Sequence, residues 1–248
     1  MDSDQLVHLE VANAVATLTL DSPANRNALS RQLIGDLRAQ LAAAASHPSV
    51  RVAVIRSAGP VFCSGADLRE AVADGMEQGA RDMVALQRAI VALEVPVLVR
   101  LDGPVRAGGL GIVAAADVVV AAESVTFALT EVRLGLAAAA ISLTLLPRMS
   151  PRGAALTVLS GAPFGAREAV EYGLVTTAVA DDAVEGAVAS LAAEFAQATR
   201  QGAREAKGLL NAELLARIDT HGEQVAAHSA RLFASPEARA AMSTFLRR

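Results

Sequence analysis

Short apolar segments alternate with glycine-bearing loops and helical patterns along most of this chain, and this alternation constrains its fold more than any other feature. Segment 15–20 alternates apolar and small polar residues, as a half-buried strand does, whereas 50–55 and 96–101 are mostly apolar. A loop and then a helical pattern follow each of the three segments. This repetition of strand, loop and helix predicts an α/β architecture.

The spacing of apolar residues predicts helices over 30–46 and near 76–93. From residue 141 onward the chain has mainly helical patterns and few strand signals. No segment rich in proline, glycine or serine separates the two parts. We therefore predict one α/β core over residues 1–190, continued by a C-terminal helical region over residues 191–248.

The charge and cysteine content exclude several classes of protein. A net charge of -4 over 248 residues lacks the basic footprint of a general nucleic-acid-binding protein. The single cysteine, Cys63, excludes an intramolecular disulfide and a metal site built from several cysteines, which suits a reducing cytoplasm. Residues 1–5 lack the apolar core of a signal peptide, and 134–147 is too short for a membrane span. We expect a cytoplasmic protein with no membrane span.

Two glycine-bearing loops, 62–68 and 102–111, each lead from a predicted strand into a predicted helix. Glycine lets the backbone approach a ligand closely, and a helix N-terminus presents unpaired N–H groups. Two such loops facing each other would form an oxyanion hole, which stabilises charge on a carbonyl oxygen. Tight packing of helix on sheet is the alternative, and the glycine pattern by itself favours it. The nucleotide-binding and hydrolase motifs G-x-G-x-x-G, G-K-[ST] and G-x-S-x-G are absent.

Four motifs, in order along the chain, resemble those of the enoyl-CoA hydratase/isomerase (crotonase) family. Residues 23–30, PANRNALS, are similar to RPE-x-RNALS of that family, and residues 60–68, PVFCSGADL, are similar to AF-x-AGADL. Residues 102–117 resemble NG-x(4)-GGG-x-x-L…CD, and residues 127–135 resemble F-x-x-PE-x-x-LG. Because the four occur together with family-like spacing, the set is far more specific than any one motif.

The resemblance implies a crotonase-like fold, in which β-β-α repeats form a right-handed spiral and C-terminal helices complete the site. It implies an acyl-CoA thioester as the substrate. No separate cofactor and no metal are implied, because CoA arrives as part of the substrate. The resemblance also implies assembly into a homotrimer or a dimer of trimers.

Several site residues are implied by the first three motifs. The backbone N–H groups of Ala66 and Gly108 match the oxyanion donors of the family. Arg26 and Arg69 match positions near the CoA phosphates, although either arginine alone would equally be a solvated surface charge. The residues that match CoA-binding positions are Ala24, Arg26, Ser64, Leu68 and Arg69.

The acid–base residues decide which reaction is expected. The well-known hydratases of the family use two glutamates, and this chain has Gly111 at the first position and Glu131 at the second. Apolar neighbours would raise the pKa of Glu131, and the alternative is an exposed glutamate paired with Arg133. One carboxylate is sufficient for an enoyl-CoA delta-isomerase, whereas hydration requires it to handle both proton transfers. We place enoyl-CoA hydratase first, with the isomerase and a non-catalytic acyl-CoA-binding homologue as alternatives.

Two basic residues and the cysteine lie outside these assignments. Arg106 occupies a position that is commonly apolar in the family, and would meet either a carboxylate on the substrate or a neighbouring acidic side chain. Lys207 is expected on the surface of a C-terminal helix, and the alternative is an approach to the CoA of a neighbouring subunit. Cys63 has no adjacent histidine to activate it, so we expect a small buried side chain.

Overall fold

The computed structural model describes residues 5–245 and 247; the first four residues of the acidic N-terminal segment, and residues 246 and 248 of the predicted helical region, lie outside the described residues. Six of the described strands form the main sheet. β1 runs antiparallel to β2, and every later strand of this sheet is parallel to its neighbour. A mostly parallel sheet is typical of the predicted α/β architecture. The strand order is β1 (Val7–Ala12), β2 (Val15–Leu20), β3 (Val52–Ser57), β4 (Val97–Leu101), β6 (Val118–Ala122) and β9 (Thr177–Val179).

A small second sheet brings the sequence motifs together. It consists of β5 (Val105–Arg106), β7 (Thr126–Ala128) and β8 (Phe164–Gly165), with β7 in the middle. A parallel bridge between Cys63 and Val105 joins the first glycine-bearing loop to β5. The N–H of Ala107 donates to the carbonyl of Ala128 at 2.9 Å. The two loops and the segment that leads to Glu131 are therefore held side by side.

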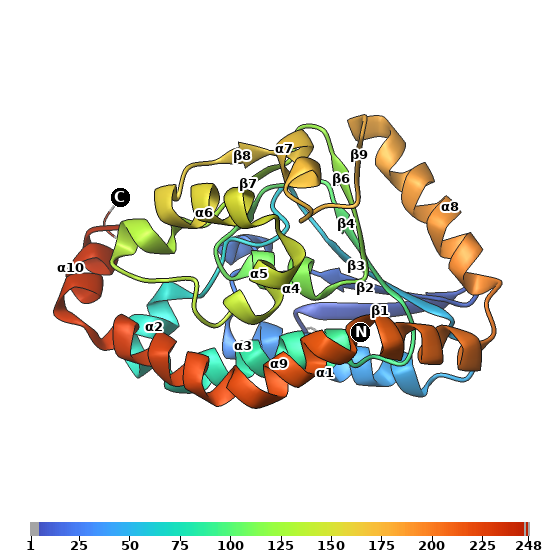
Figure 1. Ribbon diagram of the computed structural model, residues 1–248, viewed down its shortest axis with the longest axis horizontal. Coiled ribbons are helices and arrows are strands. Elements are labelled where there is room, and N and C mark those ends of the chain that lie inside the picture. The colour runs from blue at the N-terminus through green and yellow to red at the C-terminus, as the bar shows by residue number, and fades with distance from the viewer. Residues whose placement is uncertain (1–4, 246, 248) are drawn as a thin grey trace.

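Helices lie on both sides of the main sheet (Figure 1). α8 packs on β3, β4 and β6, α1 packs on β1 and β2, and the long α9 packs on α3 and α5. The boundary predicted between residues 190 and 191 falls inside α8. The helices are α1 (Arg31–Ser46), α2 (Leu68–Asp74), α3 (Glu77–Val91), α4 (Gly109–Ala115), α5 (Ser142–Arg148), α6 (Pro151–Ser160), α7 (Ala166–Glu171), α8 (Val184–Ala196), α9 (Arg200–Ala234) and α10 (Pro236–Phe245), with short 3-10 helices η1 (Pro23–Asn25), η2 (Thr130–Leu134) and η3 (Asp181–Ala183).

Local sequence signals explain several helix boundaries. The Ser30 hydroxyl accepts a hydrogen bond from the N–H of Leu33 and caps α1, as the sequence predicts. Ser150 caps α6 in the same way and Pro151 is its first residue, where a missing N–H costs nothing. Within the described ranges, no helix combines the length and the apolar character needed to cross a membrane.

Lys207 is buried in α9 with 5% of its surface exposed, so the expectation of a surface lysine is wrong. Its Nζ donates to the carbonyl oxygens of Ile90 and Val95 at 3.0 Å and lies 2.8 Å from Oδ2 of Asp117. Burial lowers the pKa of Lys207, and the Asp117 carboxylate opposes that shift. Asn211, one turn further along α9, donates to Oδ1 of Asp117 at 2.8 Å. This buried network fastens α9 to the body of the molecule, and it leaves the amine no way to reach a ligand of another subunit.

Candidate active site

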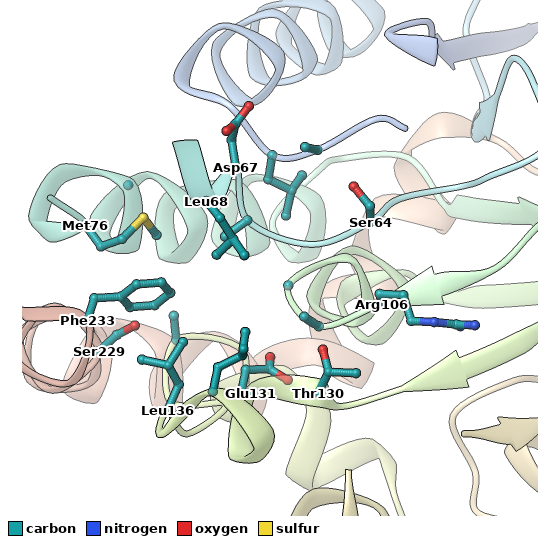
Figure 2. Close-up of a pocket in the computed structure, with 18 of the residues that line it drawn as sticks. Ser64, Asp67, Leu68, Met76, Arg106, Thr130, Glu131, Leu136, Ser229 and Phe233 are labelled. Atoms are coloured by element: carbon teal, nitrogen blue, oxygen red, sulfur yellow. The ribbon is translucent and has the colours of Figure 1, made fainter. Parts of the chain in front are cut away.

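One cavity of about 1010 Å³ lies among the two glycine-bearing loops, η2 and the C-terminal helices (Figure 2). Phe233 and Ser229 of α9 lie on one side of it, and Leu68 and Asp67 lie across from Glu131 and Thr130. All nine site residues predicted from the sequence line this cavity: Ala24, Arg26, Ser64, Ala66, Leu68, Arg69, Arg106, Gly108 and Glu131. The fold thus collects residues from all four motifs around one space.

Asn27 holds the first motif in place, a role that the sequence analysis missed. Its side chain is buried, with Oδ1 accepting from the N–H of Ser22 at 2.7 Å and Nδ2 donating to the carbonyl of Val61 at 3.0 Å. Arg26 and Asn27 both have left-handed backbone conformations, with φ values of 57° and 51°. Asparagine tolerates this conformation better than most residues do. The asparagine in the RNALS motif was the available signal, because it sets the backbone that presents Arg26 to the cavity.

The two glycine-bearing loops meet at the cavity wall. Gly65 has a φ of +96°, and a methyl group added there would lie 2.9 Å from Cβ of Ala107 and 3.6 Å from the backbone nitrogen of Gly108. A methyl group added at Gly108 would in turn lie 3.7 Å from the backbone nitrogen of Ala66. In the described part of the chain, neither the Ala66 N–H nor the Gly108 N–H donates a hydrogen bond. Two amides from separate loops are therefore free at neighbouring points of the cavity wall.

Glu131 is in η2 and its Oε2 atom is buried with no hydrogen-bond partner among the described residues. Burial raises the pKa of Glu131 to about 7. Arg133 is exposed and forms no ion pair with Glu131 in the described structure, so the alternative of an exposed pair is wrong. A carboxyl group with a pKa near neutrality and a free oxygen is suited to accept and return a proton.

Gly111 is at the position of the first glutamate of the family, and apolar side chains from other segments fill the space next to it. A methyl group added at Gly111 would lie 2.6 Å from Cε of Met83 and 2.6 Å from Cγ2 of Ile141. The Ile141 segment is itself anchored, because Nε2 of Gln87 donates to the carbonyl of Ala140 at 2.9 Å. Met83 and Ile141 both line the cavity, so its wall on this side is apolar.

We expect the Gly111→Glu variant to lose stability without gaining hydratase activity. The added side chain would overlap Met83 and Ile141, and overpacking of this kind costs about 1–3 kcal/mol before the burial of charge is counted. Thermal unfolding and initial rates on an enoyl-CoA check both parts of the expectation. Gly208→Glu is the matched control, because Gly208 is exposed and a methyl group added there has no neighbouring atom within 4 Å. A stable Gly111→Glu variant with raised activity would contradict the described packing.

The four arginines that line the cavity, Arg26, Arg69, Arg106 and Arg133, differ in their bonding. The Arg106 guanidinium donates to the carbonyls of Val105 and Thr126 at 3.0 and 2.6 Å and to the Thr126 hydroxyl at 2.9 Å. In Figure 2 it points away from Glu131. Arg26, Arg69 and Arg133 are exposed, and their guanidinium groups form no hydrogen bond or ion pair with any described residue. These three guanidinium groups are therefore available to an anion at the cavity, and two of them, Arg26 and Arg69, are the ones that the resemblance implies.

Burial makes Cys63 an unsuitable nucleophile. Its side chain is fully buried, as expected from the sequence, and desolvation raises the pKa of the thiol to about 12. A methyl group added at Gly109 would lie 2.8 Å from its Cβ, so the thiol is part of the packing between the two loops.

A family model described as enoyl-CoA hydratase/isomerase matches residues 10–248. The chain therefore belongs to the enoyl-CoA hydratase/isomerase family, a family of acyl-CoA enzymes, as the four motifs predicted. It is 31% identical over 218 residues to the mitochondrial enoyl-CoA hydratase domain-containing protein 3 of Danio rerio, a match that covers 86% of this chain and 75% of that protein. It is 32% identical over 208 residues to the (E)-benzylidenesuccinyl-CoA hydratase of Thauera aromatica, covering 79% of this chain and 81% of that protein.

Solved structures confirm the crotonase-like fold. An enoyl-CoA hydratase from Mycobacterium avium has a TM-score of 0.92 and 45% sequence identity, and the match covers 100% of this chain and 97% of that chain. An enoyl-CoA hydratase/isomerase from Mycobacterium paratuberculosis has a TM-score of 0.89 and 27% identity, covering 98% of this chain and 100% of that chain.

Proposed function

We propose that this chain is an enoyl-CoA hydratase that works through a thioester enolate. The observation that carries the proposal is the buried, unpartnered Oε2 of Glu131, which shares a cavity with the free N–H groups of Ala66 and Gly108. The carboxylate is available to move a proton, and the amides are available to hold the negative charge that this transfer creates. The names of the relatives support the same reaction class.

In the proposed mechanism the two amides bind the thioester carbonyl oxygen. As the enolate forms, that oxygen gains charge, and the hydrogen bonds from Ala66 and Gly108 strengthen. One such donor typically lowers the barrier by about 3–4 kcal/mol. The amides are fixed by the loop contacts and the small sheet, so little reorganisation is needed during the reaction.

The exposed guanidinium groups of Arg26 and Arg69 are proposed to bind the phosphates of CoA. Guanidinium groups form paired hydrogen bonds with phosphate oxygens, and these two have no competing partner in the described structure. CoA arrives with the acyl group, so the proposal includes no separate cofactor. Assembly as a homotrimer or a dimer of trimers, and a cytoplasmic location, stay predictions.

Delta-isomerisation is the second candidate, and the apolar packing at Gly111 favours it. Met83 and Ile141 fill that position. Asp67 also lines the cavity, but its carboxylate caps α2 by accepting from the N–H groups of Arg69 and Glu70. Glu131 is therefore the carboxylate that we propose moves the proton. A single carboxylate can remove a proton at one end of an allylic system and return it at the other. The reaction then needs no water.

Two substrates distinguish these candidates. Purified protein is assayed with crotonyl-CoA, which can be hydrated, and with a 3-enoyl-CoA, which can be isomerised; a binding titration with each substrate runs in parallel. Hydration of crotonyl-CoA as the faster reaction supports the proposal. Isomerisation without hydration would replace it with the second candidate, and tight binding without turnover would contradict both.

The pH dependence of kcat/KM is expected to follow the ionisation of Glu131. Hydration begins with the ionised carboxylate, and the pKa of the buried carboxyl group is raised to about 7. The rate should therefore rise about tenfold per pH unit below that pKa and level off above it. Initial rates from about pH 5 to about pH 9 check this, because kcat/KM reports groups of the free enzyme. A profile that is flat through neutrality would exclude Glu131 as the base.

A further inference from the structure

Thr130 places a second polar group next to the proton carrier. It is the first residue of η2, and it lines the same cavity as Glu131. Figure 2 shows its hydroxyl directed into the cavity, beside the Glu131 carboxylate in that view. The two residues are consecutive in the chain, so the short helix that presents the carboxylate also presents a hydroxyl.

The Thr130 hydroxyl forms no hydrogen bond with any described residue. Other threonines of the protein have partners: Thr126 accepts from Arg106, Thr144 donates to Gln87, and Thr157 donates to Gly153. A hydroxyl group prefers to make at least one hydrogen bond, and inside a cavity its partner is a water molecule or a ligand.

A water molecule bound in the cavity needs polar contacts on the side where it sits. Such a water usually makes two to four hydrogen bonds. The wall beside Gly111 offers none from side chains, since Met83 and Ile141 fill it. The end of the cavity formed by η2 offers the Thr130 hydroxyl and the Glu131 carboxylate, which lie next to each other in Figure 2. The side chains that could bind a reacting water therefore come from η2, and not from α4, the helix that contains Gly111.

We infer that the Thr130 hydroxyl binds the water molecule that adds to the substrate, and so takes the place of a second carboxylate. This inference rests on the proposed hydratase function and names the residue that would make hydration workable with one glutamate. Thr130 accepts a hydrogen bond from one O–H of the water and thereby directs the second O–H to Glu131.

The atoms balance with Glu131 as the single proton carrier. The water oxygen forms a bond to the β-carbon of the enoyl group, and one water proton passes to the Glu131 carboxylate. The electron pair of the double bond moves onto the thioester oxygen as the enolate. The enolate then takes the proton from Glu131 at its α-carbon. Water has been added, Glu131 is ionised again, and Thr130 is unchanged.

The test separates water addition from enolate formation. The full-length Thr130→Val variant keeps the shape of the side chain and removes the hydroxyl, whereas Thr130→Ser retains the hydroxyl. Two rates are measured for each protein: hydration of crotonyl-CoA, and exchange of the α-protons of butyryl-CoA with heavy water, which needs Glu131 and the amides but no added water. Ser229→Ala is the matched control. Ser229 also lines the cavity, but in Figure 2 it lies on the other side of Glu131 from Thr130, so removing its hydroxyl should not affect the water bound at Thr130.

We expect Thr130→Val to lower the hydration rate by about 10- to 100-fold, the effect of losing one hydrogen bond to the reacting water. Its exchange rate should fall by less than about 3-fold, and Thr130→Ser and Ser229→Ala should hydrate within about 3-fold of the wild-type rate. Hydration by Thr130→Val at the wild-type rate would overturn the inference and leave the proposed function intact. An equal fall in both rates would also overturn it, because it would indicate damage to η2. A wild-type protein that exchanges α-protons but does not hydrate would overturn the proposed function itself.

Discussion

In the Glu131→Gln variant we expect kcat for hydration to fall by about 1,000-fold or more, within the range that a positioned acid–base group contributes. Glutamine has nearly the same shape as glutamate, but its amide cannot accept and return a proton. The affinity for a saturated acyl-CoA should change little, because the variant leaves the free amides of Ala66 and Gly108 and the exposed arginines in place. Initial rates and a binding titration measure the two quantities separately.

Glu123→Gln is the control for this prediction. Glu123 is a surface glutamate whose carboxylate pairs with Arg167 at 3.0 Å, outside the cavity. Its replacement should leave kcat within about 2-fold of the wild-type value, since exposed ion pairs contribute little. Full activity of Glu131→Gln would show that another group carries the proton, and the proposed mechanism would then be abandoned.

The Lys207→Met variant is expected to lower the free energy of unfolding by about 3–5 kcal/mol, the usual cost of breaking a buried ion pair by removing one partner. The Asp117 carboxylate would keep its hydrogen bonds from the N–H of Val97 and from Asn211 but would lose its counter-ion. The carbonyls that now accept from Nζ would also lose their donor. Denaturant unfolding followed by circular dichroism measures the change.

The double variant Asp117→Asn/Lys207→Met tests the cause of that loss. Removing both charges leaves no uncompensated ion in the interior, so the double variant should be more stable than Lys207→Met alone. If the double variant is the less stable of the two, the interaction with Asp117 is not what makes Lys207 important, and lost packing in α9 would explain the effect instead.

The resemblance to four short motifs was sufficient to predict residues that line one cavity, because each motif lies within a short segment of the chain. Ala66 and Gly108 lie in loops with recognisable glycine spacing, and Glu131 lies in a motif of its own. The helix that follows Ser30 was predictable for the same reason, since a cap and its helix are adjacent in sequence. Strand, loop and helix repeat at regular distances, and this repetition was enough to predict the α/β core.

Features that depend on distant contacts were not predictable. The burial of Lys207 is favoured by two carbonyls and a carboxylate from remote segments, and a lysine in a helical pattern otherwise indicates a surface. The space at Gly111 is filled by Met83 and Ile141, which come from other elements. The edge strand β1 was also missed, although its residues 7–12, VHLEVA, alternate apolar and polar side chains, so a local signal was available there.

The buried lysine also makes the folded protein unusual as a chemical target. Lys207 is the only lysine in the sequence, so the folded surface presents no side-chain amine. Amine-directed reagents should therefore leave Lys207 unmodified in the native protein. They should label its amine only when α9 separates from Asp117. The rate of that labelling, followed by mass spectrometry on a peptide containing residue 207, would report how often the long helix opens.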